Sequence, residues 1–94
     1  MQGYEYPSEF ARTYYRQGKE EGREEGREQG REEGMRAAVL ALARAKRLAL
    51  TAAQETAIGA LHDERRLTEL IGALGAARSA EEARSVLEQA IAAP

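Results

Sequence analysis

The chain has 94 residues and a formal net charge of −2, with 32% charged residues, 43% hydrophobic residues and no cysteine. This length accommodates one small domain, the charge balance argues against a general affinity for nucleic acid, and the missing cysteines exclude disulfides and thiolate metal sites. No apolar run reaches membrane-spanning length, and residues 1–7 lack a signal-peptide profile. We therefore expect a cytoplasmic protein that contacts no membrane.

The first expected element is a long helix over residues 8–48, preceded by an N-terminal lead over residues 1–7. Pro7 and Ser8 are typical of a helix start, with Ser8 as the N-cap. All aromatic residues of the chain precede its glycine repeat, and we interpret them as hydrophobic anchors for one end of an oligomer. The alternative is a stacking platform for nucleic-acid bases, which requires basic residues free of acidic neighbours. These aromatic residues are Tyr4, Tyr6, Phe10, Tyr14 and Tyr15.

Within this helix, glycine returns at every fourth residue from 18 to 34, and almost only Arg and Glu lie between the glycines. Because an α-helix turns about 100° per residue, a period of four moves the glycine row by about 40° around the helix at each step. Aromatic residues extend the row at its start, and apolar residues extend it at its end. We predict that this helix face is a packing interface, consisting of Phe10, Tyr14, Gly18, Gly22, Gly26, Gly30, Gly34, Ala38 and Leu42.

The glycines make this segment a poor isolated helix. Each glycine costs roughly 0.8 to 1 kcal/mol relative to alanine in a helix interior, so five of them cost about 4 to 5 kcal/mol. In a disordered, solvated linker this cost does not arise. In a close helix pair, the missing side chains let two backbones approach, as small-xxx-small motifs do in membranes. We favour a close pair that forms in water, because the segment is too highly charged for lipid.

The charges beside the glycine row predict the orientation of such a pair. A basic flank lies on one side of the row and an acidic flank on the other. A parallel two-fold pair brings opposite flanks together, whereas an antiparallel pair brings like flanks together, and flanking charges set orientation in this way in coiled coils. We therefore favour a parallel dimer. The basic flank consists of Lys19, Arg23, Arg27 and Arg31, and the acidic flank consists of Glu21, Glu25, Gln29 and Glu33.

Three short helices are expected over residues 51–93. Thr51 and Gln54 match a capping box at the start of the first. Asp63 is placed to cap the second helix, and Gly75 is expected to end it. Each of the three helices carries a narrow apolar stripe, so we expect them to pack as a small bundle on the end of the long helix.

A second capping box at Ser79–Glu82 begins the third short helix. The predicted fold class is therefore all-α, with a long N-terminal helix followed by a small bundle of three short helices. About 60 residues remain to form a core, which is marginal for a single chain. Because oligomerisation is a common remedy for a small core, we expect an oligomer.

The residues that could carry chemistry are few. His62 and Asp63, the only histidine and the only aspartate, are adjacent at a corner between helices, where capping is their expected role. One histidine with scattered glutamates does not match the spacing of a metal site. The glycine repeat lacks the Gly-Lys-Ser/Thr of a phosphate-binding loop. We predict that the protein is not an enzyme and uses no cofactor or metal.

Several motifs resemble the C-terminal region of the bacterial recombination-promoting nuclease and transposase-like family. The first is Ser8–Gly22, which reads Ser-Glu-Phe-Ala-Arg-Thr-Tyr-Tyr-Arg-Gln-Gly-Lys-Glu-Glu-Gly and is followed by more Gly-x-x-x units. The second is the Asp-x-x-x-Leu-x-x-x-Ile pattern of Asp63, Leu67 and Ile71. The third is the Ser-Ala-Glu-Glu turn at residues 79–82.

This resemblance covers residues 4–87. The restriction-endonuclease-like nuclease core of that family, with its acidic metal ligands and lysine, has no counterpart here, so the resemblance implies no nuclease activity. It implies an oligomerising tail, which in some relatives is also made as a separate small protein that restrains the full-length nuclease as an antitoxin does. Residues 18–34 are also similar to the glycine-repeat helix of flagellar and type III secretion stator proteins, which dimerises in water.

The predicted function is an oligomerisation and protein-interaction module without catalytic activity. Its expected partners are a second copy of the chain and, by the resemblance, a full-length nuclease that carries the same tail and that this chain would regulate or inhibit. The alternative is a nucleic-acid-binding accessory domain of a mobile-element or nuclease protein. That alternative would use Arg12, Arg16, Arg44, Lys46, Arg47, Arg65 and Arg66.

Overall fold

The computed structural model describes residues 9–92, with side chains described from Arg12 onward. This part of the chain contains four helices and no strand, which confirms the expected all-α class. The predicted N-terminal lead and Ser8, the predicted N-cap of the long helix, lie outside the described residues. The helices are α1 (Glu9–Ala45), α2 (Ala52–Gly59), α3 (Glu64–Ala76) and α4 (Ala80–Ala92).

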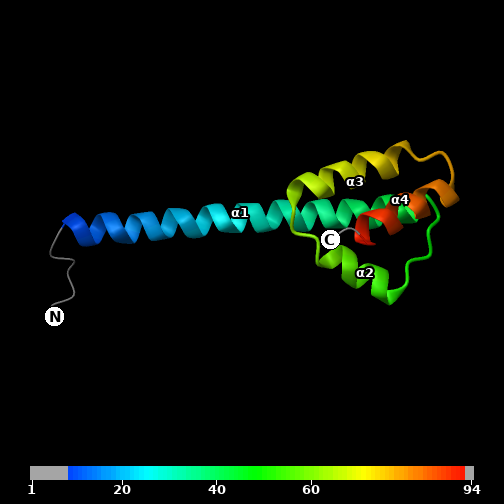
Figure 1. Cartoon of the computed structure of the whole chain (residues 1–94). Helices are drawn as coiled ribbons and strands as arrows, with labels where there is room; N and C mark the ends of the chain where they lie inside the picture. The colour runs from blue at the N-terminus through cyan, green and yellow to red at the C-terminus, as the bar shows by residue number, and fades with distance from the viewer. Residues whose placement is uncertain (1–8, 93–94) are drawn as a thin grey trace. The chain divides into compact units, whose positions relative to one another are not determined.

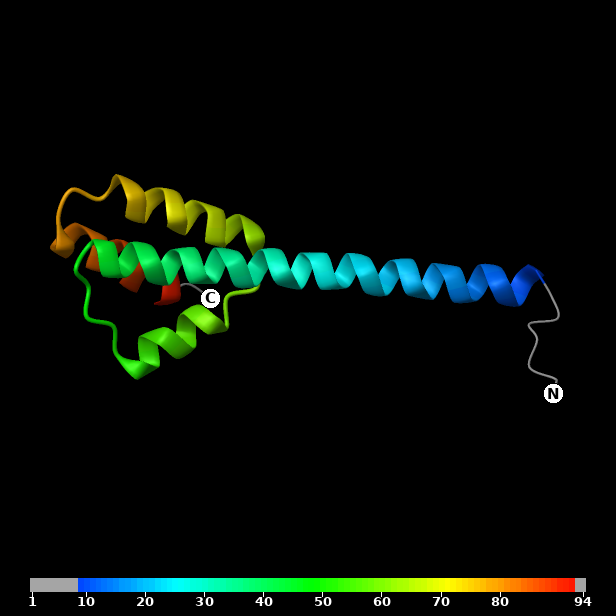
Figure 2. The same cartoon turned by 180° about the vertical axis from the view of Figure 1, so that it is seen from behind.

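The chain divides into two compact units, a repeat unit (residues 1–30) and a bundle unit (residues 31–94). In the repeat unit the described residues form a single helix, and residues 12–30 are exposed throughout. In the bundle unit, α2, α3 and α4 gather around the remaining residues of α1 (Figures 1 and 2). Helix α4 lies between the other two short helices and contacts both of them.

The hydrophobic core lies within the bundle unit. Its residues recur at the three- and four-residue spacing that places side chains on one face of a helix, as Leu67, Leu70 and Leu74 do on α3. No described polar or charged side chain is buried. Three of its residues are alanines, which each contribute little apolar area. The core consists of Val39, Ala43, Leu48, Ile58, Leu67, Leu70, Leu74, Ala77, Ala83 and Leu87.

Helix α1 ends at Ala45 in a Schellman-type cap. The Leu48 backbone N–H donates to the Ala43 carbonyl at 2.9 Å, and the Arg47 N–H donates to the Arg44 carbonyl at 2.9 Å. This turn places Arg47 in the left-handed region, with φ of 63°. Because Leu48 and Ala43 are both buried, the cap also directs the chain from α1 into the core.

The predicted caps of α2 and α3 are confirmed. The Gln54 N–H donates to Thr51 Oγ1 at 3.1 Å, and the Thr51 N–H donates to Gln54 Oε1 at 3.0 Å, which completes a capping box. Asp63 Oδ1 accepts from the N–H groups of Arg65 and Arg66 at 3.0 and 3.4 Å. These hydrogen bonds satisfy N–H groups that have no partner within the first turn of a helix.

The second predicted capping box is formed only in part. The Glu82 N–H donates to Ser79 Oγ at 3.0 Å, as expected. The Glu82 carboxylate, however, accepts from the N–H of Arg78 at 3.2 Å rather than from that of Ser79. In the turn between α3 and α4, the N–H group that reaches the Glu82 carboxylate is therefore that of Arg78, one residue before the N–H that the motif predicts.

The prediction that Gly75 ends α3 is wrong. The helix continues to Ala76, and no described glycine has a positive φ. Instead, Lys46 Nζ donates to the carbonyls of Ala77 and Gly75 at 2.8 and 3.3 Å. A cationic side chain at a helix C-terminus satisfies its last carbonyls and complements the helix dipole, so this end needs no left-handed glycine.

Candidate functional site

The glycine row has no neighbour in the structure. A Cβ atom built on any of its glycines would meet nothing within 4 Å, and none of them has a positive φ. Neither close packing nor backbone conformation within the described chain therefore requires glycine at these positions. The helix cost of about 4 to 5 kcal/mol relative to alanine remains without an internal offset. The glycine row consists of Gly18, Gly22, Gly26, Gly30 and Gly34.

Exposed aromatic rings precede the glycine row in the repeat unit. Tyr14, which the four-residue period places at the start of the predicted interface, is 72% exposed. Its neighbour Tyr15 is 62% exposed and makes an interaction within the chain. The predicted interface residue Phe10 belongs to α1, but its side chain lies outside those described. An exposed ring next to a bare helix face suits an anchor for a partner helix.

In the bundle unit, the predicted interface turns gradually towards the core. From the helical rotation of 100° per residue, Gly34 lies about 160° around α1 from the mean direction of Val39 and Ala43, and it is exposed. Leu42 lies only about 80° from that direction, and its partly buried side chain packs against the core. The face that remains free for a partner in this unit is therefore centred on Gly34, and Ala38 lies at its edge.

The charges beside the glycine row make no salt bridge with one another in the described repeat unit. No charged side chain from Lys19 to Glu28 has an oppositely charged group within 4.0 Å. Pairs such as Glu24 and Arg27, three residues apart, would stabilise an isolated helix if they formed. These side chains remain exposed and able to meet charges on another molecule.

Hydrogen bonds and an ion pair connect the corner between α2 and α3 to α1. Arg36 donates to the Leu61 carbonyl at 2.9 Å, and His62 Nδ1 lies 3.4 Å from a carboxylate oxygen of Glu32. An ion pair joins Arg31 to Glu64 at 3.3 Å. His62 therefore contacts the first α1 residues of the bundle unit, while the adjacent Asp63 caps α3. The capping role expected of both residues is thus confirmed for Asp63, whereas the described contact of His62 is with Glu32.

Most cations named for the nucleic-acid alternative in the bundle unit make contacts within the chain. Lys46 binds the C-terminal carbonyls of α3, Arg65 pairs with Glu69 at 3.5 Å, and Arg66 donates to the Ala90 carbonyl at 3.2 Å. These contacts separate the cations among different helix ends.

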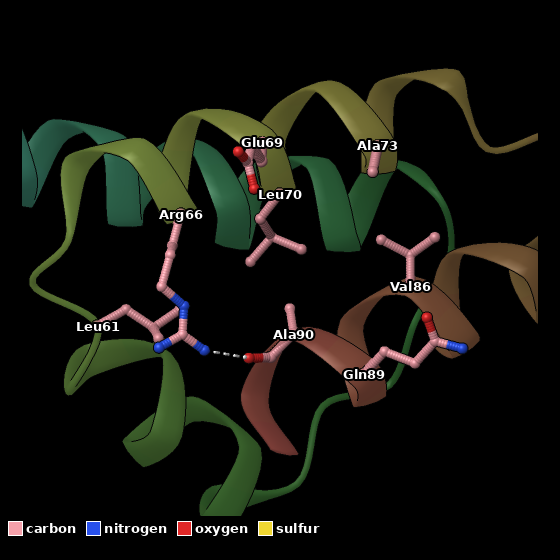
Figure 3. Close-up of a pocket in the computed structure, with 8 residues that line it drawn as sticks. All are labelled: Leu61, Arg66, Glu69, Leu70, Ala73, Val86, Gln89 and Ala90. Atoms are coloured by element: carbon pink, nitrogen blue, oxygen red, sulfur yellow. Dashed lines mark hydrogen bonds between the residues drawn. The ribbon is translucent and has the colours of Figure 1, made fainter. Parts of the chain in front are cut away.

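A groove of about 340 Å³ runs between α3 and α4 (Figure 3). Sequence reasoning did not identify it, because it depends on how two helices meet. Leu70 and Val86 point into its apolar floor, and the Arg66 side chain reaches across one end to Ala90. Its volume is at the lower end of the range for small-molecule sites. The residues that line it are Leu61, Arg66, Glu69, Leu70, Ala73, Val86, Gln89 and Ala90.

The structure shows no metal site in the described residues, where no three His, Asp or Glu side chains are grouped to hold an ion. Nor is any described helix both long and apolar enough to cross a membrane. In comparisons with known proteins, the chain matches no protein-family model, no curated protein and no solved structure.

Proposed function

We propose that the chain is an oligomerisation and protein-interaction module that pairs through the glycine row. The observation that supports this function is the absence of any neighbour within 4 Å of a Cβ built at these glycines. A second helix lying against the row would explain the glycines, because the absence of side chains lets the two backbones approach closely.

The direction of the row determines how two such helices would cross. Residues four apart form a row inclined to the helix axis, and packing of such rows against each other gives a crossing angle of about −50°. Two straight helices crossing at this angle touch only near the crossing point. We place that point at Gly26, the middle glycine of the row.

A parallel dimer is the assembly that the flanking charges favour. In a parallel pair, Arg23 and Arg27 of one copy lie on the same side as the acidic flank of the other. Each exposed pair contributes only about 0.2 to 1 kcal/mol. The charges therefore select the orientation, while the close contact of the glycine row provides the stability of the dimer.

The same interface would accept a different chain that carries the same glycine row. We therefore extend the proposal to the partner that the resemblance implies, a nuclease that ends in such a tail. Pairing with that tail would replace the nuclease's own self-association, and inhibition would follow where the nuclease acts as an oligomer. Co-purification with such a nuclease and loss of its activity would support this extension, whereas unaltered activity in the presence of the bound chain would remove the inhibitory role.

The decisive experiment compares the solution mass of the chain with that of the triple variant Gly22→Gln/Gly26→Gln/Gly30→Gln, measured by light scattering. Glutamine is a better helix former than glycine, so the variant strengthens the helix while filling the interface. Glutamine also adds no hydrophobic surface that could create a new interface. We expect the parent chain to be a dimer and the variant to be mainly monomeric at the same concentration.

The matched control is Gly72→Gln/Gly75→Gln, which makes the same chemical change on α3, where a Cβ also meets nothing within 4 Å. This control should keep the mass of the parent chain. A parent chain that is monomeric, or a triple variant with an unchanged oligomeric mass, would show that the glycine row is a solvated linker.

A further inference from the structure

We propose that residues 12–30 of α1 become a stable helix only when two copies pair, so that folding of this segment is coupled to assembly. The inference rests on the proposed function and adds to it a regulation by concentration. It follows from a contrast between the two parts of α1, one in each compact unit.

The bundle part of α1 is held by contacts within the chain. Val39 and Ala43 are completely buried. Arg31 pairs with Glu64, and Arg36 donates to the Leu61 carbonyl. Because tertiary packing supplies most of the stability of protein helices, this part remains helical in a single chain.

The repeat part lacks this burial. Every residue from 12 to 30 is exposed, and the charged side chains from Lys19 to Glu28 form no salt bridge. Glycine at every fourth position lowers the tendency to extend the helix, and like charges stacked four residues apart lower it further. Tyr15 makes an interaction within the chain but stays 62% exposed. Since no described residue of this segment is buried in a core, a single copy does not hold it in a stable helix.

Pairing would provide the packing contacts that residues 12–30 lack in a single chain. Helix formation is limited by the first turn, and extension from an existing helix requires little. The bundle part of α1 is such an existing helix, so close contact around the crossing point at Gly26 can extend it towards the N-terminus. Dilution below the dissociation constant should therefore unfold the repeat segment while the bundle stays folded.

The test follows helicity and mass together over a dilution series of the full chain, using circular dichroism and light scattering. Residues 12–30 make up roughly a quarter of the helical residues, so we expect about that fraction of the helical signal to be lost as the dimer dissociates. Hydrogen exchange read by mass spectrometry should show protection lost in residues 12–30 and kept in α3 and α4.

An alanine variant separates helix formation from pairing. Gly22→Ala/Gly26→Ala/Gly30→Ala restores a good helix former at positions where a Cβ meets nothing within 4 Å. Over the same dilution series, we expect this variant to lose less than half as much helical signal as the parent chain loses. The control Gly72→Ala/Gly75→Ala, which changes α3 instead, should show the same loss as the parent chain.

The two proposals fail in different ways. A dimer that dissociates without losing helical signal or protection in residues 12–30 would overturn the coupled folding and leave the assembly function intact. A chain whose mass is that of a monomer at every concentration would overturn both proposals, and light scattering alone would reveal it.

Discussion

Arg47 occupies a backbone conformation that suits glycine. Its φ of 63° is the only positive value among the described non-glycine residues. The left-handed region costs a residue with a Cβ about 1 to 2 kcal/mol, and glycine is the usual residue at this position of a Schellman cap. The energy of the cap hydrogen bonds and the burial of Leu48 must therefore exceed this conformational cost.

We expect Arg47→Gly to stabilise the bundle unit by about 0.5 to 1 kcal/mol, because relief of strain outweighs the greater freedom of glycine in the unfolded chain. Urea unfolding followed by circular dichroism measures the change. The control is Arg44→Gly, three residues earlier in the last turn of α1, where glycine should destabilise the helix by about 0.8 to 1 kcal/mol. Equal destabilisation by both substitutions would contradict this account of the cap.

At the scale of the element, α1 carries two faces. Its buried residues Val39 and Ala43 lie four residues apart and share one side of the helix. The glycine row has a strict period of four and so rotates around the helix. At Gly34 the two faces point in nearly opposite directions, and by Leu42 the angle between them has fallen to about 80°. A partner on the glycine row therefore avoids the bundle only up to about Ala38.

The crossing geometry predicts a graded effect along the row. At a crossing angle of about −50°, two helix axes that touch at Gly26 diverge by about 10 Å at the level of Gly18. We expect Gly26→Gln to weaken dimerisation by at least about tenfold, equivalent to 1.4 kcal/mol. Gly18→Gln, the matched control with the same change in helix propensity, should weaken it by less than about threefold. Sedimentation equilibrium measures both constants, and equal effects would indicate a contact that follows the whole row.

At the scale of the whole molecule, the chain combines a unit with a core and a unit without one. The bundle unit contains every buried residue of the described chain. The described part of the repeat unit offers only exposed side chains, and under our proposal another molecule supplies its stability. An interface made of glycine rather than leucine, as we propose, would let the protein assemble without exposing a large apolar surface.

The orientation of the pair can be measured directly, since the chain contains no cysteine and a single spin label can be placed on Gln17→Cys. In a parallel dimer crossing at Gly26, the two labels lie on the same side of the crossing point. In an antiparallel dimer they lie about 27 Å apart along the helix axis. We expect the shorter distance in pulsed dipolar spectroscopy, and it should vanish when excess unlabelled chain is added. A distribution centred on the longer separation would reject the parallel pair.

Much of the local structure could be predicted because its signals lie within one turn of the chain. The caps at Thr51 and Asp63 depend on side chains that reach only two or three residues along the backbone, and both are confirmed. The apolar spacing of α3 predicted its buried face for the same reason. The four-residue spacing of the glycine row is equally clear from the sequence. Its use as an interface stays a prediction.

Other features depended on residues distant in sequence. The sequence alone determined the all-α class, the helix starts and the drifting glycine row, because these follow from the helical period and local hydrogen bonding. Only the tertiary structure decided that Lys46 rather than a glycine closes α3, that His62 contacts Glu32, and that a groove forms between α3 and α4. Each of these requires atoms more than twenty residues apart, or two separate helices, to meet in space, and a periodic pattern within one segment does not specify which distant group arrives.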